Sequence, residues 1–158
     1  MTEELNAAKG GELKDGRIKQ TSRRILVIDD EPCILELFPY IFPLPNYLVA
    51  LAADDRAALQ LAETQVFDLA FVDYRLQEVD GAVVARKLRE LQPNMKVVLM
   101  SGYVVEDKTG AMELAGARVF LAKPFLAEQA QAIAARLFHE TELKLTTSMD
   151  SDGVRWHE

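Results

Sequence analysis

Four short apolar runs, each followed by a polar or charged residue, constrain the fold of this chain more than any other feature. A run of four apolar residues is typical of a strand buried on both faces, and parallel strands bring their carboxyl ends to one edge of a sheet. The sequence therefore predicts that acids, a hydroxyl and an ammonium group meet at one edge. The runs are residues 25–28 before Asp29 and Asp30, 69–72 before Asp73, 97–100 before Ser101, and 119–122 before Lys123.

The segments between these runs have the spacing of amphipathic helices. Five strands are expected near residues 24–29, 47–52, 67–73, 96–100 and 118–122. Five helices are expected near 32–38, 55–62, 81–91, 105–115 and from 126 to at least 140. Strict alternation of strand and helix predicts an α/β fold, a doubly wound parallel sheet with helices on both faces. Pro39 is expected to kink or stop the first helix, and Gly116 to form a left-handed cap.

The chain length and composition suit one domain with short extensions. We divide the 158 residues into a polar leader at 1–22, a globular domain at 23–140 and a tail at 141–158. No apolar run approaches the ~20 residues that span a bilayer, and no signal peptide is evident at the start, so we expect no membrane insertion. A cytoplasmic protein is the default expectation.

Charge and cysteine content narrow the classes of partner. The formal net charge is −7 and the pI is near 4.9, which argues against direct nucleic-acid binding through a general phosphate-neutralising surface. Cys33 is the only cysteine, so no internal disulfide can form. A reducing compartment is compatible with that count.

The predicted polar edge supports a specific chemistry. Three carboxylates (Asp29, Asp30 and Asp73) would repel one another at close range, and a hard divalent cation such as Mg²⁺ relieves that repulsion. Lys123 adds a positive charge, and Ser101 adds a hydroxyl that can hydrogen-bond a phosphoryl oxygen. Because carboxylates can attack phosphorus, we predict phosphoryl transfer to a carboxylate.

At this point the sequence resembles the receiver domain of two-component response regulators over about residues 23–138. The resemblance depends on the order and spacing of several short features, none of which is specific alone. They are Asp29 and Asp30 after the first strand, Asp73 ending the third, Asp80 and Gly81 seven and eight residues later, Ser101 ending the fourth, and Lys123, Pro124 and Phe125 ending the fifth.

The resemblance implies a flavodoxin-like fold with strand order 2-1-3-4-5 and a role for each site residue. Asp73 would be the phosphoacceptor, and Ser101 and Lys123 would contact the phosphoryl group, with the Lys123–Pro124 bond cis. Mg²⁺ would be bound by Asp30, Asp73 and the backbone carbonyl of Arg75, with Asp29 assisting through water. The donor would be a phosphohistidine on a histidine kinase or a histidine phosphotransfer protein. The chain would be a signalling phosphoacceptor rather than an enzyme.

Some positions depart from the common receiver pattern. Gln77 stands where a proline usually follows the phosphoacceptor by four residues, so a looser loop is expected there. Phe120 replaces a switching tyrosine, so any switch at this position must work by ring packing. Arg75 and Tyr103 occupy variable rim positions, and we predict that they tune autodephosphorylation by screening the attacking water.

The simplest alternatives treat these residues as structural. Asp29 and Asp30 alone fit a helix N-cap, and Ser101 fits ordinary turn chemistry. Two other functions remain: a receiver-like interaction scaffold that is not phosphorylated, and a phosphohydrolase with an aspartate nucleophile. Our leading expectation is a stand-alone receiver that binds an unidentified downstream protein through the face formed by residues 105–115, 118–122 and 126–140. A homodimer through that face is left open.

Overall fold

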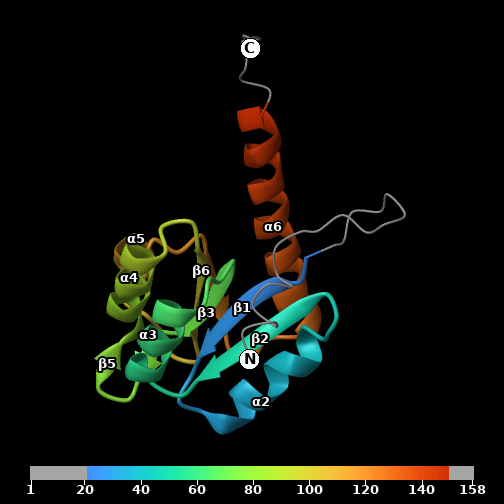
Figure 1. Ribbon diagram of the computed structural model, residues 1–158. Helices are drawn as coiled ribbons and strands as arrows, with labels where there is room; N and C mark the ends of the chain where they lie inside the picture. The colour runs from blue at the N-terminus through green and yellow to red at the C-terminus, as the bar shows by residue number, and fades with distance from the viewer. Residues whose placement is uncertain (1–20, 150–158) are drawn as a thin grey trace.

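The computed structural model describes residues 21–149, and side chains as far as residue 144. Its centre is a five-stranded parallel sheet in the order β2-β1-β3-β6-β7 (Figure 1). β6 and β7 are the fourth and fifth strands of this sheet along the chain, so the order is the predicted 2-1-3-4-5. The predicted α/β fold is confirmed. The sheet strands are β1 (Arg23–Ile28), β2 (Tyr47–Ala52), β3 (Leu69–Asp73), β6 (Lys96–Ser101) and β7 (Val119–Ala122).

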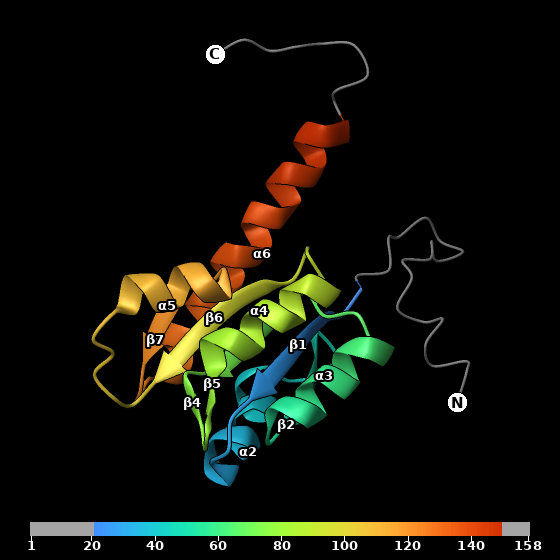
Figure 2. The same ribbon diagram turned by 90° about the vertical axis from the view of Figure 1, so that its left-hand side faces the viewer.

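Five described helices cover the two faces of this sheet (Figures 1 and 2). α2 and α6 pack on one face, whereas α3, α4 and α5 pack on the other. Successive residues of a strand point to opposite faces, so Leu69 and Phe71 enter one core while Ala70 and Val72 enter the other. The helices are α2 (Pro32–Ile41), α3 (Asp55–Thr64), α4 (Gly81–Leu91), α5 (Lys108–Ala115) and α6 (Ala127–Met149).

The sequence predicted that Pro39 would kink or stop the first helix, and the helix does not stop there. α2 continues two residues beyond the proline to Ile41, and the amide of Phe42 donates to the carbonyl of Phe38 at 2.9 Å. Phe38, Ile41 and Phe42 are each at most 3% exposed. Burying these side chains offsets the backbone hydrogen bond that a proline cannot donate.

The last helix extends well past residue 140, the minimum extent that the sequence predicted. α6 runs to Met149, nine residues past the boundary that we drew at residue 140, and its far end projects beyond the body of the domain (Figures 1 and 2). Arg23 at the start of β1 donates to Glu142 at 2.5 Å, and the Thr141 hydroxyl donates to the Leu137 carbonyl. Residues 141–149 are therefore helical, although their polar composition had suggested a tail. The leader at 1–20 and the tail residues 150–158 lie outside the described part of the chain.

The segment after β3 forms a small antiparallel hairpin, β4 (Arg75–Leu76) and β5 (Val79–Asp80), where we had expected a looser loop. Gln77 begins its two-residue turn at φ 53°, a conformation closed to proline, whose ring fixes φ near −65°. The hairpin returns the chain to Gly81, whose amide donates to the Tyr74 carbonyl at 2.7 Å. A Cβ on Gly81 would lie only 1.9 Å from the Asp73 carbonyl oxygen, so this approach requires glycine.

Several helix ends carry the caps that the sequence predicts. Asp54 and Asp80 accept hydrogen bonds from backbone amides of α3 and α4, which identifies both as N-caps. α5 begins at Lys108 rather than near residue 105, because Asp107 caps it. Gly116 ends α5 with φ 63°, so the predicted left-handed cap is confirmed. Within residues 21–149, no helix has both the length and the apolar character needed to cross a bilayer.

The aromatic cluster around Phe38 yields a prediction about stability. Phe38 is fully buried and contacts the rings of Phe42, Phe71 and Phe125. We expect Phe38→Ala to lower the free energy of unfolding by roughly 3–5 kcal/mol in urea titrations, because it leaves a cavity. Tyr40→Ala is the matched control, since Tyr40 lies on the same helix and is 84% exposed. Equal losses in the two variants would contradict this account of the core.

Candidate functional site

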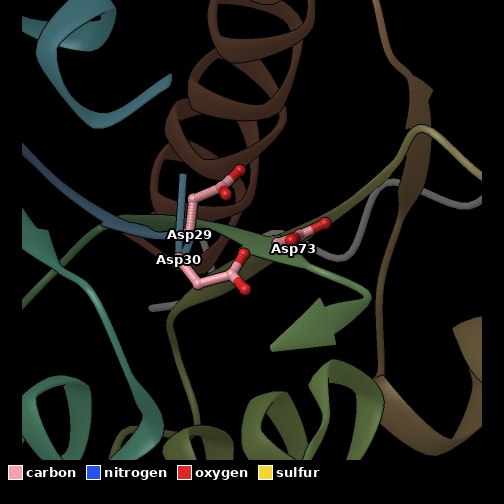
Figure 3. A group of neighbouring side chains, drawn as sticks. All are labelled: Asp29, Asp30 and Asp73. Atoms are coloured by element: carbon pink, nitrogen blue, oxygen red, sulfur yellow. The ribbon is translucent and has the colours of Figure 1, made fainter. Parts of the chain in front are cut away.

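The sheet brings five of the six predicted site residues to one edge, and the sixth, Arg75, lines the cleft beside them. Asp29 and Asp30 follow β1, and Asp73 ends β3, which lies between β1 and β6. Asp73 pairs in register with Met100, so the end of β3 lies beside Ser101, the last residue of β6. Lys123 follows β7, and its amide donates to the Ser101 carbonyl at 2.8 Å. Figure 3 shows the three carboxylates gathered at the ends of β1 and β3.

Lys123 is the positive centre of this group. Its Nζ lies 2.6 Å from Asp29 Oδ2 and 3.4 Å from Asp73 Oδ1. Its side chain is 9% exposed and that of Asp29 is fully buried, so water screens this ion pair little. The peptide bond from Lys123 to Pro124 is cis, as the resemblance implied. One ammonium therefore contacts two carboxylates that end different strands.

The buried carboxylates are difficult to ionise together. Burial raises the pKa of Asp29 above its ordinary value, although hydrogen bonds from Lys123 and the Glu31 amide oppose that shift. Burial, followed by repulsion from Asp29, raises the pKa of Asp73 to about 6. Burial alone would lower the pKa of Lys123, but its hydrogen bond to Asp29 and the nearby acids raise it above its ordinary value. The ammonium stays protonated, and the acids favour additional positive charge.

The acidic residues fit a hard divalent cation. Asp29, Asp30 and Asp73 each offer one carboxylate oxygen, and these oxygens lie within 4.8 Å of one another. Asp30 and Asp73 line the adjacent cleft, whereas Asp29 is occupied by Lys123 and by the Glu31 amide, which donates to Asp29 Oδ1 at 2.9 Å. Two open oxygen donors beside a third acid match the preference of Mg²⁺ for one or two carboxylates plus water.

Ser101 lies at the site but its hydroxyl is engaged locally. The side chain is buried, and Ser101 Oγ accepts from the Tyr103 amide at 3.0 Å and lies 3.2 Å from the Tyr103 carbonyl oxygen. This turn geometry matches the structural alternative considered from the sequence. A contact from this hydroxyl to a phosphoryl group would require it to exchange partners.

The site opens into a cleft of about 740 Å³ on the surface. Arg75 and Tyr103 lie on its rim, and the Arg75 guanidinium carbon is 4.8 Å from the centre of the Tyr103 ring, within cation–π range. Glu31 also lines the cleft, with its Oε1 3.4 Å from Lys123 Nζ. Glu31 was not among the predicted site residues, although its place directly after the two aspartates was a usable signal.

The ring of Phe120 packs against the side chain of Lys108. Lys108, the first residue of α5, places its Nζ 4.7 Å from the centre of the Phe120 ring. Phe120 lies on β7 next to Leu99 of β6, three residues before Lys123. The ring therefore links β7 to the start of α5 through a cation–π contact.

The chain belongs to the family of response regulator receiver domains, whose pattern matches residues 25–135. The fold and the acid–lysine edge already define this class, and the resemblance seen in the sequence is confirmed. Structural neighbours agree: a CheY-like receiver domain protein from Methanospirillum hungatei JF-1 superposes with a TM-score of 0.70 at 28% identity, covering 77% of this chain and 98% of that one.

Relatives with assigned roles are larger regulators. The alginate biosynthesis transcriptional regulatory protein AlgB of Pseudomonas aeruginosa is 36% identical over 84% of this chain, which spans 29% of AlgB. PhoP of Bacillus subtilis, an alkaline phosphatase synthesis transcriptional regulatory protein, is 31% identical over 80% of this chain and 53% of its own length. The chain thus spans about half or less of these relatives. A response regulator from Burkholderia pseudomallei, solved with a phosphorylated aspartic acid, a calcium ion and citrate, is 26% identical with a TM-score of 0.66, covering 85% of this chain and 78% of that one.

The crowded carboxylates predict a gain in stability when one charge is removed. The pKa of Asp73 is higher in the folded protein than its ordinary value, so ionisation of Asp73 favours the unfolded state. This cost is absent well below pH 4, grows between pH 4 and about 6, and is fully present above that range. Without divalent cations at pH 7.5, we expect Asp73→Asn to raise the free energy of unfolding by on the order of 1–3 kcal/mol.

Urea titrations in EDTA at pH 7.5 and at pH 4 measure this effect. The gain should shrink at pH 4, where the wild-type carboxyl is largely protonated. Asp55→Asn on α3 removes the same charge outside the site and serves as the control. A stability loss for Asp73→Asn at pH 7.5 would show that the contact between Asp73 and Lys123 outweighs burial and repulsion.

Proposed function

We propose that this receiver domain takes a phosphoryl group from a phosphohistidine onto Asp73 in the presence of Mg²⁺. The observation that supports this most is the position of Lys123, 3.4 Å from Asp73 Oδ1 and 2.6 Å from Asp29 Oδ2, beside two carboxylates that open to a cleft. A structural lysine would need one acidic partner, and the additional open acids suit cation binding. The donor is a histidine kinase or a histidine phosphotransfer protein.

The proposed step follows from the charges at the site. A carboxylate oxygen of Asp73 attacks phosphorus, the nitrogen–phosphorus bond of the phosphohistidine breaks, and its electron pair returns to the imidazole. The product is an acyl phosphate on Asp73. Asp30, Asp73 and the backbone carbonyl of Arg75 would hold Mg²⁺, with Asp29 acting through water, and the bound ion would supply positive charge for the phosphoryl oxygens. Lys123 then trades part of its contact with Asp73 for the new phosphoryl oxygens.

The output surface in this proposal is the face of α5, β7 and α6. Tyr103 and Val104 in the loop before α5 are 65% and 93% exposed, and Leu126 before α6 is 67% exposed. When Ser101 releases the Tyr103 backbone to bind the phosphoryl group, this loop loses two hydrogen bonds and shifts its population of conformers. Ring packing of Phe120 against Lys108 carries the shift to α5. A downstream protein reads the altered face.

A direct test uses a small phosphodonor. Incubation with acetyl phosphate and Mg²⁺, followed by intact-protein mass spectrometry, should give one phosphoryl group per chain. EDTA and Asp73→Asn should each abolish it, while Asp55→Asn on α3 should leave it unchanged. Lack of modification despite bound Mg²⁺ would favour an unphosphorylated scaffold. Continued turnover of phosphate esters without a stable adduct would favour a hydrolase.

The rim contact between Arg75 and Tyr103 leads to a prediction about how long the phosphoryl group stays on Asp73. The pair lies over the cleft that water must enter, so Arg75→Ala and Tyr103→Ala should each shorten the lifetime several-fold. Loss of the adduct after removal of the phosphodonor measures the rate by mass spectrometry. Arg86→Ala is the control, since Arg86 is exposed on α4, outside the cleft. An unchanged lifetime in both rim variants would contradict a screening role.

A further inference from the structure

A second, positively charged pocket lies at the opposite edge of the sheet from Asp73. It has a volume of about 560 Å³ and lies where β6 begins, between the last turn of α4, the cap of α5 and α6. Four cationic residues from different elements line it, together with the buried Met95 and the cap residue Gly116. The cationic residues are Arg89 of α4, Lys96 of β6, Arg118 just before β7 and Lys144 of α6.

The described carboxylates neutralise only part of the charge in this pocket. Arg118 pairs with Glu140 at 2.9 Å. Within residues 21–144, Arg89, Lys96 and Lys144 form no ion pair. Burial, then repulsion from Lys144 and Arg118, lowers the pKa of Lys96, against the attraction of Glu140. A chain with a net charge of −7 thus concentrates positive charge at one small site.

Arg89 provides an independent sign of an unfilled site. Its Nε is buried and makes no hydrogen bond, and it is the only buried side-chain nitrogen or oxygen in that state among the described residues. The rest of its side chain packs so closely on Gly116 that a Cβ there would lie 1.6 Å from Arg89 Nη1. A buried donor without an acceptor is costly, and a bound anion that draws the guanidinium toward it would supply acceptors.

The simplest structural explanation covers only part of these observations. Arg89 lies in the last turn of α4, where a positive charge favours the negative end of the helix dipole. Lys96 begins a strand and Arg118 precedes one, so the helix dipole of α4 does not account for them. Convergence of cations from four elements on one cavity is instead what recognition of a multiply charged anion requires.

We propose that this pocket binds a small anion carrying a diphosphate or longer phosphate chain. Its volume falls within the range of small-molecule sites, about 300–1,000 Å³. Arg89 and Arg118 present forked donors that match phosphate oxygens, and Lys96 and Lys144 add point charges. The binding needs neither Mg²⁺ nor Asp73, and it is therefore a site separate from the phosphoacceptor edge. Free polyphosphates and nucleotides share this chemistry.

Calorimetric titration of pyrophosphate into the protein in EDTA, at constant ionic strength, tests the proposal. Lys96→Gln should weaken binding by about tenfold or more, since it removes a charged contact. Lys87→Gln removes the same charge from α4, outside the pocket, and should change the affinity by less than about twofold. Asp73→Asn should retain binding. Circular dichroism verifies folding, and Arg118→Gln replaces Lys96→Gln if the latter does not fold.

Titrations with ADP and with citrate distinguish a nucleotide from a free polyphosphate and show which results would contradict the proposal. ADP binding as tightly as pyrophosphate indicates that only phosphates are read, whereas tighter ADP binding indicates a nucleotide; both outcomes support the pocket. Absence of binding, or equal weakening by Lys87→Gln and Lys96→Gln, would overturn it. Citrate binding as tightly as pyrophosphate would show a site that reads charge alone, and would overturn the assignment to phosphate. These results are independent of whether Asp73 is phosphorylated.

Discussion

The ion pair between Lys123 and Asp29 is the interaction on which the site depends most. Both side chains are almost fully removed from water, and their atoms lie 2.6 Å apart. Two buried charges cost desolvation energy that only close pairing offsets, so loss of either partner would leave an uncompensated charge beside Asp73. The same ammonium contacts Asp73 and Glu31 at 3.4 Å. One cation thus holds together acids that would otherwise repel one another.

The fold supplies what this pair needs. A parallel sheet covered on both faces excludes water from the ends of its central strands, and Asp73 ends the most buried of them, β3. The close approach of Gly81 to the Asp73 carbonyl fixes where the chain leaves that strand. At the same time, the β4–β5 hairpin carries Arg75 to the rim of the cleft. The covered sheet therefore buries Asp73, whereas the β4–β5 hairpin contributes to the cleft that gives access to it.

Much of the fold and the candidate site could be predicted from the sequence. The apolar runs are long enough to identify buried strands, and a buried parallel sheet brings the residues that follow them to one edge. This is why Asp73 and Lys123 were predicted to meet. The sequence pattern did not predict which of several possible partners a polar side chain contacts. Ser101 binds the Tyr103 backbone, and Glu31 contacts Lys123. These depend on loop conformations that spacing does not encode.

The remaining differences have local physical causes. Pro39 lies within α2 between the buried Phe38 and the buried Ile41 and Phe42, and a propensity rule does not weigh that burial. In the extension of α6, Glu142 contacts Arg23, which is distant in sequence, so a local pattern does not reveal this contact. The basic pocket could not be predicted from the sequence, because its residues are also distant from one another along the chain. Its cations are spread over four elements, and only the folded chain brings Arg89, Lys96 and Arg118 together.

Among the three neighbouring acids, we propose that Asp73 is the residue that accepts the phosphoryl group. Borohydride reduction of the protein after treatment with acetyl phosphate and Mg²⁺ converts an aspartyl phosphate to homoserine, which peptide mass spectrometry locates. Our account predicts homoserine at position 73 and unmodified aspartate at positions 29 and 30. Homoserine at position 29 or 30, or reduction at none of the three, would contradict it.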